Sequence, residues 1–192
     1  KLISPMQFIP QLEREGSIIK LDYYMLEEVC RFLRKWMDEG HAPICISVNF
    51  SRKHLDEDDM VEHIVSILDE HGIAHQYIEI ELTESEDFQN YEIMTNIVNE
   101  LSEAGIGTSM DDFGTGFSSL NMIKKLDLKV IKIDRSFIPL ETDYSGKDKD
   151  MIMFCNIVTL LRELGKKTIA EGVETLQQLR YLENVGCDIV QG

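Results

Sequence analysis

Two adjacent carboxylates, Asp111 and Asp112, stand in the string TSMDDFGTGFSS at residues 108–119. Neighbouring like charges repel each other, and the glycines that follow loosen the backbone. The pair therefore costs stability unless something positive or mobile makes use of it. A bound cation is the simplest partner for two carboxylates at this position.

Five other segments of the chain are apolar at first and then end in a polar residue. These residues are Asn49, Glu81, Lys132, Glu171 and Gln191. A single one of them is most simply a solvated strand end. Six polar endings in succession, several of them flanked by apolar residues, indicate a shared edge that does chemistry.

The six segments are short and mostly rich in Ile, Val and Thr, which is typical of strands. They span residues 42–50, 76–84, 106–113, 128–135, 166–173 and 187–192. Between them lie stretches whose apolar residues recur every three or four positions and which mostly end in Gly, as helices do. These predict helices at 58–72, 90–105, 147–165 and 175–186, a shorter one at 117–126, and a helical hairpin at 5–39.

The alternation of strands and helices predicts an α/β fold with a parallel sheet and helices outside it. In a parallel barrel the carboxyl ends of the strands converge on one face, where active sites are built. The six polar endings would then meet at that face.

The donor types in this set are hard oxygens, with neither His nor Cys among them, which suits Mg²⁺ or Mn²⁺ better than zinc. An adjacent Asp pair can serve two ions at once. Two such ions activate a water and neutralise phosphoryl oxygens when a phosphodiester is hydrolysed. Lys132 adds a local cation that could orient the attacking water or the phosphate.

Composition and charge narrow the class of protein. The 192 residues are 43% hydrophobic, which predicts one globular domain over residues 1–192. A net charge of −16 argues against a surface that tracks a nucleic-acid polymer. No apolar run approaches the roughly 20 residues of a membrane helix, so we expect a soluble, cytoplasmic domain without membrane contact.

The cysteines and histidines predict no metal site. Of the four dispersed cysteines, Cys45 and Cys155 lie in apolar patterns and are predicted to be small core residues in a reducing compartment. The histidines share no ligand spacing and are predicted to face solvent; they are His41, His54, His63, His71 and His75. Asp134 and Arg135 are assigned to local structure, with a phosphate contact left open for Arg135.

Seven strings in order resemble the EAL-domain family, the cyclic di-GMP phosphodiesterases of bacteria. They are FIPQLEREGSIIKLDYYML, SVNFS, ELTES, DDFGTGFSSL, IKIDRSF, IAEGVET and the final QG. The resemblance covers nearly the whole chain, from about residue 3. It implies a TIM-like (β/α) barrel, of which about six strands are present, and hydrolysis of cyclic di-GMP to linear pGpG with two Mg²⁺ or Mn²⁺ ions.

The resemblance also implies a role for each matched residue. The implied metal ligands are Asn49, Glu81, Asp111, Asp112 and Glu171. Catalytic roles fall to Glu171 as candidate base, and to Lys132 and Gln191 near the attacking water. Substrate contacts are expected from Asn49, Asp112 and Glu174. Glu84 matches the residue that anchors the loop 113–119 and couples it to the Asp pair.

Parts of the family pattern do not occur in this sequence. The Glu-Ala-Leu motif, with its metal-binding Glu and a nearby Arg, would precede residue 1, and a further string would follow the final Gly192. We therefore expect this chain to be a piece of a longer protein, lacking the first strands and the C-terminal end of the domain. Other signalling domains and a homodimer are implied as partners, and the missing Glu would weaken catalysis by this piece.

Two functions stay open at this point. One is a metal-dependent phosphodiesterase that acts on cyclic di-GMP. The other is a catalytically silent domain that binds cyclic di-GMP or a protein partner as a sensor. Silent relatives are expected to lose some of the strand-end ligands, and every ligand that the sequence can show is intact, which favours the enzyme.

Overall fold

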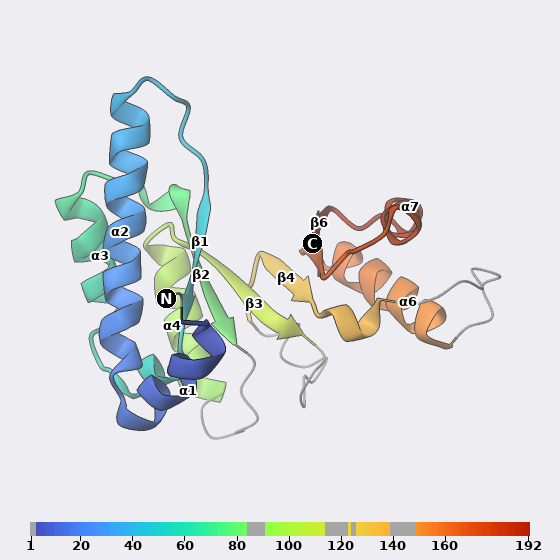
Figure 1. Ribbon diagram of the computed structural model, residues 1–192, viewed down its shortest axis with the longest axis horizontal. Coiled ribbons are helices and arrows are strands. Elements are labelled where there is room, and N and C mark those ends of the chain that lie inside the picture. Colours follow the sequence, from blue (N-terminus) through green and yellow to red (C-terminus); the bar gives the residue numbers. More distant parts are fainter. Residues whose placement is uncertain (1–2, 84–90, 114–122, 124–125, 139–148) are drawn as a thin grey trace. The chain divides into compact units, whose positions relative to one another are not determined.

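The computed structural model describes residues 3–83, 91–113, 123, 126–138 and 149–192 (Figure 1). The chain divides into two compact units. The first holds residues 1–83 and 89–108, and the second holds residues 84–88 and 109–192. Each unit contains parallel strands that alternate with helices along the chain, as the sequence pattern predicted.

The first unit begins with the predicted helical hairpin and continues with two strands and their helices. Its elements are α1 (Pro5–Glu15), α2 (Ile18–Asp38), β1 (Ile46–Phe50), η1 (Arg52–Asp56), α3 (Met60–Glu70), η2 (His75–Tyr77), β2 (Ile78–Thr83) and α4 (Tyr91–Glu103). Strands β1 and β2 pair in parallel, from Ile46 opposite Ile78 to Phe50 opposite Leu82.

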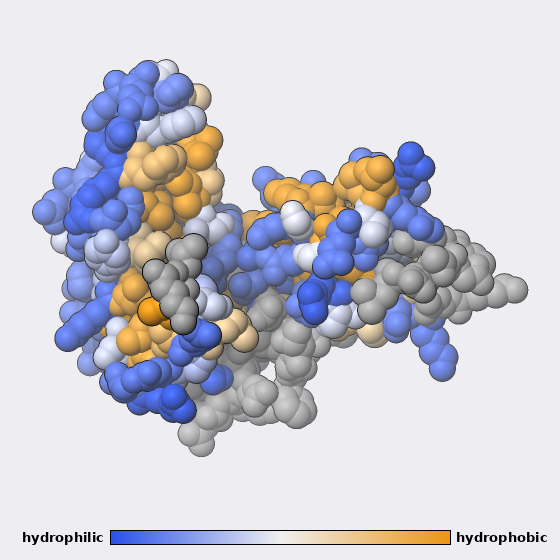
Figure 2. All heavy atoms as spheres, in the orientation of Figure 1, coloured by the Kyte–Doolittle hydropathy of each residue, from blue (hydrophilic) through white to orange (hydrophobic). Residues whose placement is uncertain are grey.

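The long helix α2 carries the core of this unit. Its buried side chains recur every three or four residues, at Ile18, Asp22, Tyr23, Leu26, Cys30 and Leu33, and the helix contacts β1 and α3. The outer face is polar and carries ion pairs one turn apart, such as Arg34 with Asp38 at 2.8 Å. Figure 2 shows this division, with apolar residues between α2 and β1 and hydrophilic residues on the far side of the helix.

The second unit contains the remaining strands. They are β3 (Gly107–Phe113), which enters this unit at Ser109, β4 (Val130–Ile133), β5 (Lys167–Glu171) and β6 (Ile189–Gln191). The connecting elements are η4 (Arg135–Phe137), α6 (Lys149–Glu163) and α7 (Leu176–Val185). The helix predicted at 117–126 falls largely outside the described residues.

All described strand pairs of this unit are parallel: β3 with β4, β4 with β5, and β5 with β6. The strands follow the order of the chain. Parallel strands in chain order, joined through helices, confirm the predicted α/β fold class. Every predicted strand is present, shortened by one to four residues at its ends.

Two predictions about small side chains are wrong. Cys45 and Cys155 are exposed, whereas Cys30 is the buried cysteine, and burial raises the pKa of the Cys30 thiol to about 11. Cys155 lies one residue beside the buried stripe of α6, which contains Phe154 and Val158. An apolar neighbourhood in sequence does not decide which face of a helix a residue occupies.

Among the described residues, no helix combines the length and the apolar character that crossing a membrane requires.

Candidate active site

A buried lysine joins two carboxylates at the carboxyl ends of strands in the second unit. Lys132, on β4, is only 6% exposed. Its Nζ lies 3.2 Å from Asp111 Oδ1 and 2.7 Å from Glu171 Oε1, on the strands at either side. Both carboxylates keep less than a quarter of their side-chain surface exposed. Three residues predicted from strand endings therefore meet within ion-pair distance.

The Asp pair lies in an irregularity of β3. Met110 is opposite Ile131 and Phe113 is opposite Ile133, so β3 uses two residues where β4 uses one, Lys132. This is a β-bulge, a device that re-aims side chains beside active sites. It lets two consecutive Asp residues occupy the strand position that faces one lysine.

Gln191 lies beside Glu171, because the register pairs these two residues across β5 and β6. That register is fixed near its start by Asp188, whose Oδ2 accepts hydrogen bonds from Thr168 N–H at 2.8 Å and from Thr168 Oγ1 at 2.9 Å. Thr168 is fully buried. The buried contact between Thr168 and Asp188, near the start of β5 and just before β6, thus keeps the predicted catalytic residues Glu171 and Gln191 opposite each other.

Glu174 lies just before α7, in a segment that is tied to the helix start. Its backbone N–H donates to Gln178 Oε1 at 2.9 Å. The same oxygen accepts a hydrogen bond from Thr175 N–H at 3.1 Å, and Thr175 Oγ1 accepts one from Gln178 N–H at 3.2 Å. This is a capping box, which satisfies donors at a helix N-terminus. The exposed Glu174 side chain therefore projects from a fixed backbone.

Asp134 and Arg135 have the local roles that the sequence suggested. Asp134 caps η4 by accepting a hydrogen bond from Ser136 N–H at 2.9 Å. Burial alone would raise the pKa of Asp134, but the hydrogen bonds from Ser136 and Arg135, together with the positive charge of Arg135, lower this pKa below its ordinary value. Arg135 packs its aliphatic stem against Gly172.

Gly172, directly after Glu171, is required by geometry. Its φ is +70°, a region that residues with a Cβ rarely adopt. A Cβ at this position would also lie 2.6 Å from Arg135 Cβ. The glycine in IAEGVET thus allows β5 to end closely against η4.

We expect Gly172→Ala to cost about 2–4 kcal/mol of unfolding free energy, from left-handed strain plus steric overlap. Gly165→Ala is the matched control, because Gly165 has φ +71° and nothing within 4 Å of an added Cβ. It should cost only the backbone strain, about 1 kcal/mol. Urea unfolding measures both, and equal losses for the two variants would contradict the assigned contact.

In the first unit, Asn49 and Glu81 are direct partners in the register of β1 and β2. Their neighbours Val48, Phe50 and Ile80 are buried on the opposite face of the strands. Glu81 is 5% exposed, whereas Asn49 is exposed. Two oxygen-bearing side chains predicted as metal ligands therefore share one row and one face.

Some predicted residues cannot be placed in this arrangement. Asp112 lies in β3, but its side chain is outside the described part of the structure. Glu84 and residues 114–119 of the loop are also outside it. Among the described side chains, no group of three or more His, Cys, Asp or Glu residues lies close enough together to hold a metal ion.

The donors that are described nevertheless fit a hard divalent cation. Asp111 and Glu171 come from different strands, yet both reach one cationic centre, the Lys132 ammonium. Carboxylate oxygens are the ligands that Mg²⁺ and Mn²⁺ prefer. The carboxylates of Asp111 and Glu171 thus both point toward one positive charge, as ligands of a shared metal ion would.

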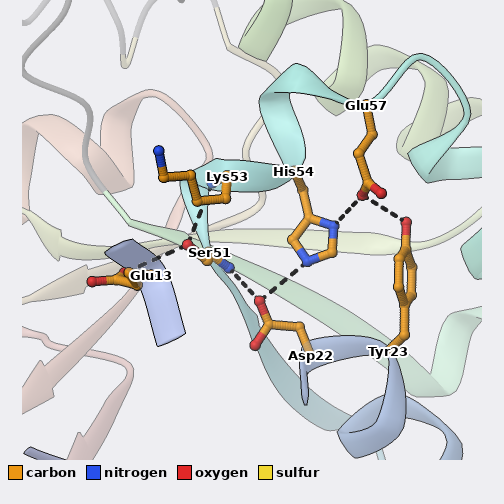
Figure 3. A network of polar contacts seen from close by, with 7 residues as sticks. All are labelled: Glu13, Asp22, Tyr23, Ser51, Lys53, His54 and Glu57. Carbon is orange, nitrogen blue, oxygen red and sulfur yellow. Dashed lines mark hydrogen bonds and ion pairs between the residues drawn. The ribbon is translucent and has the colours of Figure 1, made fainter. Parts of the chain in front are cut away.

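Sequence reasoning missed a second polar cluster, in the first unit. His54, predicted to face solvent, is 1% exposed and lies between the carboxylates of Asp22 and Glu57 (Figure 3). The signal was Asp22, a carboxylate within the apolar stripe of α2. A buried carboxylate needs donors, and a nearby histidine can supply them.

Comparison with known proteins identifies the family. The model of the EAL domain matches residues 1–192, and the chain belongs to that family. It is 38% identical over 191 residues to the bifunctional diguanylate cyclase/cyclic di-GMP phosphodiesterase MucR of Pseudomonas aeruginosa, covering 100% of this chain and 27% of MucR. It is 36% identical to the cyclic di-GMP phosphodiesterase NbdA of the same organism, covering 24% of that protein.

Solved structures give the same result. The PaMucR phosphodiesterase in complex with c-di-GMP matches with a TM-score of 0.89 and 36% identity, over 100% of this chain and 82% of that one. The EAL domain of Mycobacterium smegmatis DcpA matches with a TM-score of 0.80 and 31% identity, over 90% and 76%. The six parallel strands with their helices are therefore part of a TIM-like barrel, as predicted.

Proposed function

We propose that this chain is the catalytic part of a cyclic di-GMP phosphodiesterase that hydrolyses its substrate to linear pGpG. The observation that carries the proposal is the buried Lys132 between Asp111 and Glu171, at the strand ends where the family motifs lie. The names of MucR and NbdA and the nucleotide complex of MucR support it. The chain spans about a quarter of the length of these curated relatives.

The proposed enzyme uses two Mg²⁺ or Mn²⁺ ions. The residues that would hold them are Asn49, Glu81, Asp111, Asp112 and Glu171. When bound, the ions would supply Lewis acidity and neutralise negative charge on the phosphodiester. They would also reconcile a chain of net charge −16 with an anionic substrate.

The protein's own groups have complementary tasks. Glu171 accepts a proton from the attacking water, and Gln191, its partner in the register, orients that water. Lys132 orients both carboxylates and faces the charge that develops on the phosphoryl group. Water adds to phosphorus and the bond from phosphorus to the 3′ oxygen breaks, which leaves a 5′-phosphate and a 3′-hydroxyl.

The outer contacts belong to the same proposal. Asn49, Asp112 and Glu174 contact the nucleotide, and Glu84 anchors the loop that follows the Asp pair. The exposed Glu174, on its capped backbone, suits a role at the rim of the site. The homodimer, the attached signalling domains and the cytoplasmic location are further parts of the proposal.

The first test is turnover by the full-length protein that contains this chain. We expect it to convert cyclic di-GMP to a linear dinucleotide with Mg²⁺ or Mn²⁺, and to stop when EDTA is added, as followed by chromatography. Duplex DNA at equal phosphate concentration is the control substrate and should stay intact. Binding of cyclic di-GMP without hydrolysis in saturating metal would favour the sensor function instead.

A further inference from the structure

The buried cluster in the first unit is centred on His54, which lies on η1 just after β1. Its Nε2 is 3.1 Å from Asp22 Oδ2 on α2, and its Nδ1 is 2.6 Å from Glu57 Oε2 (Figure 3). The Asp22 side chain is 10% exposed and that of Glu57 is 25% exposed. We call these three residues the Asp22–His54–Glu57 clamp.

Both ring nitrogens of His54 lie within hydrogen-bond distance of a carboxylate oxygen. A neutral ring carries one N–H and could donate to only one of the two carboxylates, whereas a doubly protonated ring donates to both. Charge-assisted hydrogen bonds of this kind are about twice as strong as neutral ones. Such a ring ties α2 to the segment that follows β1.

Further donors complete the two carboxylates. Ser51 N–H donates to Asp22 Oδ2 at 2.9 Å, and the Tyr23 hydroxyl donates to Glu57 Oε2 at 3.1 Å. Burial, followed by the charge of Glu57, raises the pKa of Tyr23 above its ordinary value, which keeps the hydroxyl a donor. Asp22 Oδ2 and Glu57 Oε2 therefore each have two hydrogen-bond partners.

Aromatic rings enclose the histidine. The ring centroid of His54 lies 4.9 Å from that of Tyr23, edge to face, and 4.6 Å from that of Phe50. Phe50 and His54 are both only 1% exposed. Hydrogen bonds shielded from water in this way gain strength, and a polar group left unpaired there lowers the stability of the fold.

The clamp acts at the end of the strand that carries Asn49. Ser51, two residues further on, is held at its N–H by Asp22. Its Oγ lies 3.4 Å from Glu13 on α1 and accepts a hydrogen bond from Lys53 N–H at 3.3 Å. Phe50, between Asn49 and Ser51, packs on the ring of His54. The backbone on the carboxyl side of Asn49 is thus pinned to both helices of the hairpin.

We propose that His54 is a positioning residue, which through the Asp22–His54–Glu57 clamp fixes the carboxyl end of β1 and so presents Asn49 beside Glu81 for metal binding. This inference rests on the proposed function, because it assigns Asn49 as a metal ligand. The register supports it, since Asn49 and Glu81 are direct partners across β1 and β2. Asn49 and Glu81 can keep the spacing that a bound metal ion requires only if the carboxyl ends of β1 and β2 are both fixed.

The test compares His54→Gln with His63→Gln in the full-length protein. Gln at residue 54 keeps one donor and loses the second contact. His63 is the matched control because its ring stacks on Tyr23, at 4.0 Å between centroids, within the same aromatic cluster. Hydrogen exchange of the Ser51 amide, followed by NMR without metal, reports the clamp directly. Calorimetry with Mn²⁺ measures the metal affinity to which Asn49 and Glu81 are proposed to contribute.

We expect His54→Gln to speed exchange of the Ser51 amide and to weaken Mn²⁺ binding, each by about tenfold, as losses in the surroundings of a ligand do. His63→Gln should change neither. Both are measured at a temperature where circular dichroism shows every variant folded, so a purely structural role would leave the metal affinity unchanged. Unaltered Ser51 exchange, or faster exchange with unaltered Mn²⁺ affinity, would overturn the proposal.

Glu57→Gln provides a second variant that should fold if His54→Gln does not. Its amide oxygen can still accept hydrogen bonds from His54 and Tyr23, but the charge is gone. We expect it to shift Ser51 exchange and Mn²⁺ affinity in the same direction by a smaller factor, and no shift in either would overturn the proposal. Failure of the wild-type protein to bind Mn²⁺ at all would instead count against the proposed function itself.

Discussion

Replacing Asp111 and Asp112 together by Asn is expected to abolish Mn²⁺ binding measurable by calorimetry while leaving the fold intact. Metal ions of this class bind charged carboxylates far better than amides. The β-bulge brings two consecutive residues opposite Lys132, and the double change removes both negative charges that the Asp pair would contribute to the proposed metal site. We expect the apparent affinity to fall by more than about 100-fold, which corresponds to about 2.7 kcal/mol.

The chain supplies a matched control for this change. Asp58 and Asp59 are also adjacent and are exposed just before α3. Their double replacement by Asn alters the net charge by the same amount at a distance along the chain from the proposed ligands. It should leave Mn²⁺ affinity within about twofold of the wild type. Equal loss in both double variants would show that overall charge, not the Asp pair, governs binding.

The strands, and the meeting of Asp111, Lys132 and Glu171 near their carboxyl ends, could be predicted from sequence for a simple reason. Buried parallel strands are short apolar runs, and their carboxyl ends turn polar at the functional face. Lys132 and Glu171 were found in this way, and their contact confirms the shared edge. Segment ends were less accurate: the segment predicted at 42–50 begins as a strand only at Ile46.

The bulge and the glycine could not be predicted, because both depend on a neighbouring strand. Nothing in the string MDDF says that Met110 and Phe113 pair with Ile131 and Ile133, two residues apart. The need for Gly172 likewise appears only when Arg135 is known to lie 2.6 Å from its missing Cβ. Register and long-range packing decide such positions, and one sequence does not contain them explicitly.

His54 was missed because a histidine has no fixed place in a hydrophobic pattern. The residue is buried only because Asp22 and Glu57 provide acceptors for both ring nitrogens. Asp22 was the readable clue, since it interrupts the apolar stripe between Ile18 and Leu26. A charged residue on a buried face predicts a buried partner, although sequence alone leaves several candidates for it.

Replacing Lys132 by Met should separate the roles of the lysine and of the metal ligands. Met fills most of the volume of the buried stem but carries no charge. The change removes the ammonium that lies 3.2 Å from Asp111 Oδ1 and 2.7 Å from Glu171 Oε1. The two carboxylates then repel each other, and we expect the metal-free protein to lose about 3 kcal/mol of stability.

Added Mn²⁺ should return much of that stability, because the ion supplies the missing positive charge to the same carboxylates. The thermal midpoint of Lys132→Met should therefore rise more with Mn²⁺ than that of the wild type. Its Mn²⁺ affinity should be equal or tighter, since no ammonium competes for Asp111 and Glu171. Calorimetry and thermal melts with and without metal measure both effects.

Turnover should behave differently from metal binding. If Lys132 faces the charge that develops on the phosphoryl group, its loss in the full-length protein should lower kcat by about 100- to 1000-fold even in saturating Mn²⁺. Lys129→Met is the control, because Lys129 is exposed just before the same strand. Wild-type turnover of cyclic di-GMP by Lys132→Met would show that Lys132 stabilises the carboxylates of Asp111 and Glu171 but takes no part in catalysis. Loss of Mn²⁺ binding in that variant would show that the ammonium is needed to assemble the ligands.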